Sequence, residues 1–282
     1  MKPGDAAPRA GAGHVEVDLR DGRAVQGALA EIAPDAVIHL AALAVPREAQ
    51  AAPLDALRVN YTAVAHLLER LRRGVPRARL LFVSTGEVYA RRALGAPPAC
   101  EDEPLAPPNV YAATKASAEQ LVVLAAERDG LDVVRVRPFN HSGPGRPPLY
   151  AESAFAQQVA QLEKRGGEPV VRVGNLEAVR DFSDVRDVAA AYLLLLERGA
   201  RGEVYNVCSG AGRSIGSVLE YLMGRSSIPL RSERDPARFE PTVPEQVALI
   251  GDPARVHRLG WQPQYPFERT LDDVLDYWRA RA

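Results

Sequence analysis

The sequence is poor in cysteine and in lysine. Its two cysteines, Cys100 and Cys208, are far apart and lie near no second cluster of metal ligands. Neither a disulfide framework nor a zinc site is therefore predicted, and we expect reduced thiols, a cytoplasmic protein and no bound metal. Lysine supplies only three of the 35 basic residues, namely Lys2, Lys115 and Lys164.

Long apolar runs and an excess of either charge are also missing. No stretch approaches the roughly 18 consecutive apolar residues of a membrane-spanning helix, and Met1–Asp5 opens no apolar signal sequence. The formal net charge is −1 and no tract is dense in lysine and arginine, so we expect neither a nucleic-acid nor a membrane partner. With 282 residues and 46% apolar content, the chain can bury one sizeable core, or one core and a small lobe.

Short apolar segments alternate with longer helical patterns in the first half of the chain. Strands that are apolar on both faces, separated by helices, indicate a parallel sheet covered on both sides, which is a doubly wound α/β domain. The predicted strands are His14–Leu19, Ala36–Leu40, Arg79–Ser84 and Leu131–Arg137, and the predicted helices are Ala24–Ile32, Leu54–Arg73 and Tyr111–Arg128.

A tyrosine and a lysine stand four residues apart in Tyr111-Ala-Ala-Thr-Lys115. This spacing places the phenol and the ammonium on one helix face. A neighbouring ammonium favours the phenolate, so Tyr111 could exchange a proton with a carbinol or ketone oxygen while a cofactor carries the hydride. The pair alone also arises by chance among nine tyrosines, but a sequence this poor in lysine keeps Lys115 where a compact charge is needed.

A second motif follows the predicted strand at Arg79–Ser84 and reads Ser84-Thr85-Gly86-Glu87. Ligands of open α/β sheets bind at the carboxyl ends of strands, so these hydroxyls and this carboxylate lie where chemistry is expected. A polar cap at an ordinary strand end is the alternative interpretation. The two motifs together are far more specific than either one.

With these motifs the chain resembles the extended short-chain dehydrogenases that act on nucleotide sugars, over about Val15 to Tyr277. Val136–Gly145 reads VRPFNHSGPG, and two later stretches, Arg172–Phe182 and Gly202–Val207, are similar to the nucleotide-sugar part of that family. The Phe-Asn-His-x-Gly-Pro-Gly wording resembles the GDP-4-keto-6-deoxymannose reductases in particular. In GDP-mannose 4,6-dehydratases this stretch usually reads Phe-Asn-His-Glu-Ser-Pro.

The resemblance implies a Rossmann-type domain that binds NAD or NADP. In that family Tyr111 would act on the C4 oxygen and Lys115 would hold the nicotinamide ribose hydroxyls. Asp18 and Leu19 would flank the adenine. The further cofactor contacts that the resemblance implies are Leu40, Ala41, Ala42, Val83 and Pro138.

The resemblance also implies a site for a GDP-linked sugar. Thr85 would share the C4 oxygen with Tyr111, Glu87 would be catalytic, and Asn140 and Arg180 would contact phosphates through geometry that suits an arginine fork. For Arg180 and Arg238 the alternative role is an ordinary surface charge exposed to solvent. We expect His39 to be a structural histidine whose hydrogen bonds are satisfied within the fold. The implied substrate contacts are Ser84, Thr85, Glu87, Asn140, Arg180, Arg238 and Glu245, with Glu240 where the family often has arginine.

The sequence pattern and the family resemblance together predict the domain organisation. Residues 1–140 are predicted to form the dinucleotide-binding domain, to which 184–208 return, and 141–183 with 209–282 are predicted to form mainly the substrate-binding lobe. The helices expected there are Ser153–Lys164, Val185–Glu197, Ile215–Met223 and Thr270–Arg279, and a strand is expected at Glu203–Cys208. A homodimer is expected through Leu54–Arg73 and Tyr111–Arg128, with these candidate contacts: Leu67, Leu68, Leu121, Val122 and Leu124.

One element of the family is not found in these residues, the opening strand, Gly-x-x-Gly-x-x-Gly turn and helix that hold the cofactor pyrophosphate. Gly11-Ala12-Gly13 is no substitute, because a predicted strand follows it where a helix is required. The sequence therefore predicts a domain without its first strands and weak binding of the cofactor by this chain.

Several functions stay open at this stage. Reduction of the C4 ketone of a GDP-4-keto-6-deoxyhexose, giving GDP-6-deoxymannose (GDP-rhamnose), is the first. A 4,6-dehydratase or an epimerase is the second: Glu87 could remove a C5 proton, but Gly86 stands where dTDP-glucose dehydratases carry an acid. An inactive remnant or a non-catalytic partner subunit is the third.

Overall fold

The computed structural model describes residues 13–238 and 246–282, and the chain divides into two compact units. Unit 1 comprises Met1–Ser84, Asn109–Arg135 and Ala200–Glu203. Unit 2 comprises Thr85–Pro108, Val136–Gly199 and Val204–Ala282. Contacts alone assign no ligand to either unit, so the division into cofactor and substrate domains stays a prediction.

The main sheet has the strand order β1-β2-β3-β7, and β1 pairs with β2 in parallel, with His39 opposite Phe82. Parallel strands linked by helices make this an α/β fold of the Rossmann type, which confirms the predicted fold class. The strands are β1 (Ala36–His39), β2 (Arg79–Val83), β3 (Val133–Pro138) and β7 (Val204–Val207).

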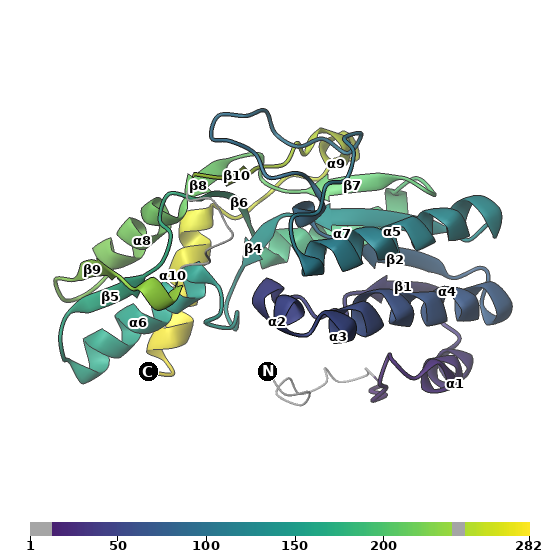
Figure 1. Ribbon diagram of the computed structural model, residues 1–282, viewed down its shortest axis with the longest axis horizontal. Coiled ribbons are helices and arrows are strands. Elements are labelled where there is room, and N and C mark those ends of the chain that lie inside the picture. The colour runs from purple at the N-terminus through teal and green to yellow at the C-terminus, as the bar shows by residue number, and fades with distance from the viewer. Residues whose placement is uncertain (1–12, 239–245) are drawn as a thin grey trace. The chain divides into compact units, whose positions relative to one another are not determined.

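The helices of unit 1 cover this sheet, and α1 packs against α4 while α4 packs against α5 (Figure 1). Helix α1 starts where the Asp21 carboxylate accepts hydrogen bonds from the backbone amides of Arg23 and Ala24. Predicted helix Leu54–Arg73 is present but is interrupted by one π-helical turn, η1 (Arg58–Thr62). The helices are α1 (Gly22–Ile32), α2 (Pro46–Ala51), α3 (Pro53–Leu57), α4 (Ala63–Gly74) and α5 (Val110–Arg128).

The predicted strand His14–Leu19 is wrong, because residues 13–21 form no strand. A strand persists only where a neighbour accepts its backbone hydrogen bonds. Among the described residues β1 is the edge of the sheet and pairs with β2 alone. The segment instead ends in a turn that leads into the Asp21 cap.

Unit 2 holds the larger hydrophobic core, in which Phe182 stacks on Phe267 at 4.8 Å between ring centroids. Helices α6, α8 and α10 gather around this core (Figure 1). The four predicted helices are confirmed within a few residues. They are α6 (Ala151–Arg165), α7 (Val185–Arg198), α8 (Ile215–Gly224) and α10 (Phe267–Arg279), and α9 (Ala254–Arg258) was not predicted.

Short strands that the sequence did not reveal complete unit 2. Strand β6 pairs in parallel with β10 and β4 and in antiparallel with β8, and β5 pairs with β9. Their bounds are β4 (Asn140–Ser142), β5 (Val170–Val173), β6 (Val179–Asp184), β8 (Gly212–Ser214), β9 (Arg231–Arg234) and β10 (Ala248–Leu249), with 3₁₀ turns η2 (Gly86–Val88) and η3 (Pro236–Arg238).

Two searches of the described residues found nothing. None of their helices is both long and apolar enough to cross a bilayer. Within 13–238 and 246–282, no three side chains of histidine, cysteine, aspartate or glutamate are grouped so as to hold a metal ion.

Candidate active site

Tyr111 and Lys115 both lie in the first two turns of α5. Asn109 fixes the start of the helix, since its side-chain oxygen accepts a 2.8 Å hydrogen bond from the Ala112 amide. Tyr111 is half-buried, whereas Lys115 is 2% exposed. The predicted helix therefore exists, and it presents a phenol beside a buried ammonium.

The Lys115 ammonium lies over the ring of Phe82, 4.6 Å from its centroid. Burial lowers the pKa of Lys115 to about 8, and the nearby Glu119 carboxylate opposes this shift. No hydrogen bond to Lys115 is found within the described residues. A buried ammonium supported only by an aromatic face is suited to receive a polar ligand.

His39 also lies next to the Phe82 ring. Its imidazole stacks on Phe82 with centroids 6.1 Å apart and planes 10° apart. Burial, and then the charge of Lys115, lowers the pKa of His39 to about 4, so the ring is neutral at physiological pH. The prediction of a satisfied structural histidine is wrong, because the buried Nε2 has no hydrogen-bond partner.

Ser84 adds a third polar group near Phe82, two residues along β2. Its hydroxyl is buried and also has no hydrogen-bond partner. Buried polar groups in folded proteins are nearly always paired. Lys115 Nζ, His39 Nε2 and Ser84 Oγ are thus three buried polar atoms near one aromatic ring, and the contact of Lys115 with the nicotinamide ribose stays a prediction.

Asn60, which the sequence analysis missed, anchors the loop that follows β1. Its side chain accepts a 2.8 Å bond from the Leu43 amide and donates to the Leu43 carbonyl at 3.2 Å. It also donates to the Thr114 hydroxyl at 2.9 Å, next to Lys115. The loop holds the predicted cofactor residues Leu40–Ala42. Asn60 is fully buried, and nothing in the sequence around it marked it as an anchor.

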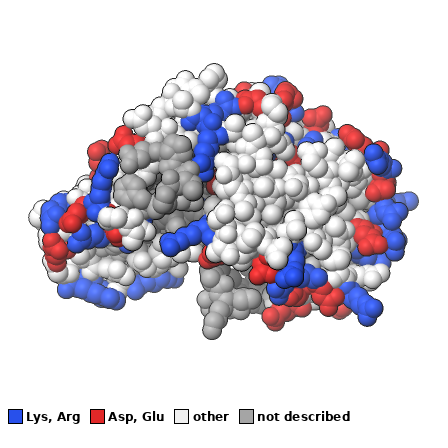
Figure 2. Space-filling view, in the orientation of Figure 1, with Lys and Arg blue, Asp and Glu red and all other residues white. Residues whose placement is uncertain are grey.

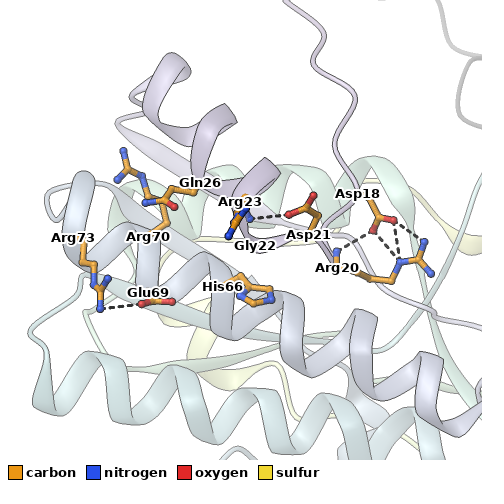
Figure 3. Close-up of a pocket in the computed structure, with 10 residues that line it drawn as sticks. All are labelled: Asp18, Arg20, Asp21, Gly22, Arg23, Gln26, His66, Glu69, Arg70 and Arg73. Atoms are coloured by element: carbon orange, nitrogen blue, oxygen red, sulfur yellow. Dashed lines mark hydrogen bonds and ion pairs between the residues drawn. The ribbon is translucent and has the colours of Figure 1, made fainter.

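Asp18 lies in a different part of unit 1, at a pocket of about 680 Å³ between α1 and α4 (Figure 3). Its carboxylate is bound by Arg20 at 2.6 Å, and this hydrogen bonding lowers the pKa of Asp18 to about 2. Of the predicted site residues, Asp18 alone lines the pocket, so the pocket is not where the predicted chemistry takes place. Its lining is Asp18, Arg20, Asp21, Gly22, Arg23, Gln26, His66, Glu69, Arg70 and Arg73.

In unit 2 the Thr85 hydroxyl caps the 3₁₀ turn η2 by accepting a 3.2 Å hydrogen bond from the Glu87 amide. A side chain at Gly86 would meet the Phe139 ring at 2.9 Å, so the turn needs glycine there. This explains in steric terms why no acid precedes Glu87. Thr85 is 8% exposed and Glu87 is half-buried.

Arg180 lies on β6 and is largely buried. Its guanidinium donates to the carbonyls of Val179 at 2.9 Å and Val247 at 3.2 Å. Burial lowers the pKa of Arg180, the Glu87 carboxylate raises it and the Arg91 guanidinium lowers it. Its burial and its two carbonyl acceptors argue against an ordinary solvated charge, and the contact of Arg180 with phosphate stays a prediction.

The remaining predicted residues of unit 2 are unevenly supported. Asn140 is half-buried and pairs with Phe182 between β4 and β6, and Pro138 is buried at the end of β3. Arg238 is bound to Asp235 at 3.2 Å and is partly exposed, so its charge is already matched. Glu245 and Glu240 lie outside the described residues.

Tyr89, two residues after the Ser84-Thr85-Gly86-Glu87 motif, is structural. Its hydroxyl accepts from Arg137 at 2.8 Å and donates to Asn206 at 2.8 Å. Burial raises the pKa of Tyr89 to about 12. The Tyr89 hydroxyl therefore serves the fold, and the role of Tyr111 as a proton donor stays a prediction.

Comparison with known proteins agrees with this geometry. Residues 8–274 match the family model described as GDP-mannose 4,6 dehydratase. The chain is 36% identical over 250 residues to the GDP-6-deoxy-D-mannose reductase of Pseudomonas aeruginosa, covering 88% of this chain and 82% of that one.

Solved structures of nucleotide-sugar enzymes also match this chain. RMD from Pseudomonas aeruginosa complexed with NADPH matches with a TM-score of 0.87 and 33% identity, over 95% of this chain and 89% of that chain. The UDP-glucose 4-epimerase of Thermus thermophilus in complex with NAD matches with a TM-score of 0.83 and 28% identity, over 94% and 84%. The chain belongs to the GDP-mannose 4,6-dehydratase family of extended short-chain dehydrogenases.

Proposed function

We propose that this protein reduces the C4 ketone of a GDP-4-keto-6-deoxyhexose with NAD(P)H, giving GDP-6-deoxymannose. One observation carries the proposal: the Tyr111 and Lys115 pair on α5, in a chain 36% identical to a GDP-6-deoxy-D-mannose reductase. The buried unpaired groups around Phe82 support a nicotinamide cofactor.

Each residue has a role that follows from its surroundings. The cofactor, when bound, supplies the hydride. The Tyr111 hydroxyl gives its proton to the C4 oxygen of the substrate. The Thr85 hydroxyl can donate a hydrogen bond to the substrate. The Lys115 ammonium orients the ribose and makes loss of the Tyr111 proton easier, because a nearby positive charge favours the phenolate. Arg180 binds a phosphate.

The reductase and the 4,6-dehydratase differ in what they need beyond these residues. A dehydratase must also remove the C5 proton and help hydroxide leave from C6. Glu87 is available for the first step, but Gly86 is held against Phe139 and offers no acid for the second. We therefore propose reduction as the net reaction.

The experiment supplies NADPH with the 4-keto sugar nucleotide and, separately, NADP+ with GDP-mannose, because a dehydratase begins by passing the C4 hydride to the oxidised cofactor. We expect NADPH to be consumed with the 4-keto substrate, in equal amount to the product, and GDP-mannose to stay unchanged. A dehydratase would convert GDP-mannose with no net change in the cofactor, and that result would contradict the proposal.

A second candidate is a non-catalytic partner subunit. It is favoured by the poor cover of β1, of which only His39 is buried, and by the Arg20 bond that occupies Asp18. Calorimetric titration of NADPH separates the two functions. Micromolar binding supports the reductase, whereas GDP binding without NADPH binding supports the partner subunit.

A homodimer through α3, η1 and α5 is also proposed. Leu67, Leu68 and Val122, expected at the interface, belong instead to the core of unit 1. Leu54, Leu57 and Leu124 are 67%, 43% and 40% exposed, and Figure 2 shows a broad uncharged surface over α3 and α5. An exposed apolar patch of this kind suits an interface that uses the same surface on both subunits.

Sedimentation of a Leu54→Ser, Leu124→Ser variant tests the dimer against the parent protein. We expect the parent to sediment as a dimer at micromolar concentration and the variant as a folded monomer. A parent that is already monomeric would contradict the proposal.

Cys100 and Cys208 are free thiols, which supports the reducing, cytoplasmic setting that we also propose.

A further inference from the structure

Arginines occupy one row across the small sheet of unit 2. Arg180 on β6 lies opposite Arg213 on β8 and opposite Leu249 on β10. On the far side of β10, Arg92 forms an antiparallel bridge with Ala248, which brings Arg91 beside Leu249. Side chains in one row of a sheet point to the same face, so Arg213, Arg180 and Arg91 share a face.

The charge of Arg213 is already matched. Its guanidinium forms a 2.8 Å ion pair with Glu268 and lies over the Phe267 ring. Arg180 has two backbone carbonyl acceptors and no ion pair with any described carboxylate. A buried guanidinium without a bonded anion is costly unless a ligand supplies one.

Arg91 and Glu87 both face Arg180. The charge of each acts on the Arg180 guanidinium, in opposite directions. They stand four residues apart on the segment that begins with the Thr85-capped turn. Two guanidiniums on one face of the sheet favour a ligand with more than one negative charge.

The spacing of the two arginines fits adjacent phosphates. Neighbouring strands lie about 4.8 Å apart, so the Arg91 and Arg180 backbones, separated by β10, are about 10 Å apart. Arginine side chains extending from both positions can converge on two linked phosphates, each bound by two parallel N–H donors.

We propose that Arg91 is a second phosphate-binding arginine, which binds one phosphate of a nucleoside diphosphate while Arg180 binds the other. This inference rests on the proposed function, because it assigns a further contact at the same substrate site. It makes Arg91 a determinant of affinity for diphosphate substrates and leaves recognition of the nucleoside to other residues.

Calorimetric titration of GDP and of guanosine into the full chain tests the inference. We expect Arg91→Ala to weaken GDP about ten- to a hundred-fold, the loss that one charge-assisted contact produces, and to leave guanosine unchanged. Inorganic pyrophosphate should compete with GDP in the parent protein and much less in the variant. Arg91→Lys should restore part of the GDP affinity, because it keeps the charge without the fork.

Arg213→Ala is the matched control, since it removes an equal charge from the same row. Its GDP affinity should stay within about twofold of the parent, because Glu268 already neutralises Arg213. Arg91→Ala with unchanged GDP affinity would overturn the inference while leaving the proposed function in place. A parent protein that does not bind GDP would overturn both.

Discussion

Two sets of buried polar groups, one in each unit, are bonded differently. In unit 2 the fully buried Asp181 accepts hydrogen bonds from the amides of Ser209, Gly210 and Gly251 and from the Ser209 hydroxyl, so its carboxylate serves the fold. In unit 1 the His39 Nε2 and Ser84 Oγ atoms near Phe82 have no hydrogen-bond partner in the structure, and in unit 2 the same holds for Ser142 Oγ and Ser183 Oγ. Unsatisfied buried groups cost stability, so each of these positions is a place where a ligand could supply the missing bond.

The two edge strands of the main sheet, β1 and β7, also differ in how deeply they are buried. All four residues of β7 are buried, whereas β1 buries one residue of four and leaves Ile38 37% exposed. Among the described residues, the β7 edge of this sheet is thus more deeply buried than the β1 edge. The comparison predicts that ligand chemistry and stability can be changed separately in the two units.

The largest expected effect is on turnover. Tyr111→Phe should lower turnover about 10²- to 10⁴-fold, since it removes the proton donor, while GDP affinity in unit 2 stays unchanged. Steady-state rates and GDP titrations on the parent and the variant check both halves. A variant with turnover within about tenfold of the parent would show that another group supplies the proton.

Removing a buried carboxylate should lower the free energy of unfolding more than removing an exposed one. Asp181→Ala should lower the free energy of unfolding by about 3 kcal/mol or more, because it leaves several buried donors unpaired. Asp18→Ala should leave the melting temperature unchanged, because its ion pair with Arg20 is exposed to solvent. Urea and thermal unfolding of both variants measure this, and equal losses would refute the contrast between the units.

The smallest expected effect depends on pH. The pKa of Lys115 is about 8 in the folded protein against 10.5 normally, so the unfolded state holds more protons between these values. Stability of the ligand-free parent should therefore rise as pH increases from about 8 to about 10.5. The Lys115→Met variant should have a free energy of unfolding about 3 kcal/mol higher than the parent near neutral pH. Its stability should not rise between pH 8 and pH 10.5.

Urea unfolding near pH 7 and near pH 10, on the parent and on Lys115→Met, supplies the measurement. Lys164→Met, at a lysine of α6 on the surface, is the control and should keep the pH dependence of the parent. Parallel curves for the parent and Lys115→Met would mean that Lys115 already has a partner in the folded protein.

The sequence was informative where local pattern decides the structure. Helix α5 was predicted almost to the residue, because Asn109 caps it and its alanines favour helix. The π-helical turn was missed, since nothing local reveals that Asn60 must reach both Leu43 and Thr114. The strand at His14–Leu19 failed for the same reason: a strand depends on its neighbour more than on its own residues.

The residues of the candidate site also differ in whether local sequence pattern could reveal them. Tyr111, Lys115 and Thr85 were found from motifs, and the structure adds what surrounds them. His39 looked structural because a lone histidine on an apolar strand usually is, and only its unpaired Nε2 shows otherwise. The interface leucines could not be told from core leucines, because helical spacing gives the same pattern for both. Arg91 became visible only through the register of β6 and β10.

Transfer of isotope from labelled cofactor tests the central claim most directly. The protein is given GDP-4-keto-6-deoxymannose and NADPH deuterated at the hydride position, and the product is analysed by mass spectrometry and NMR. We predict one deuterium per product molecule, at C4 of GDP-6-deoxymannose. A product without deuterium, or with deuterium at another carbon, would contradict reduction at C4 by this protein.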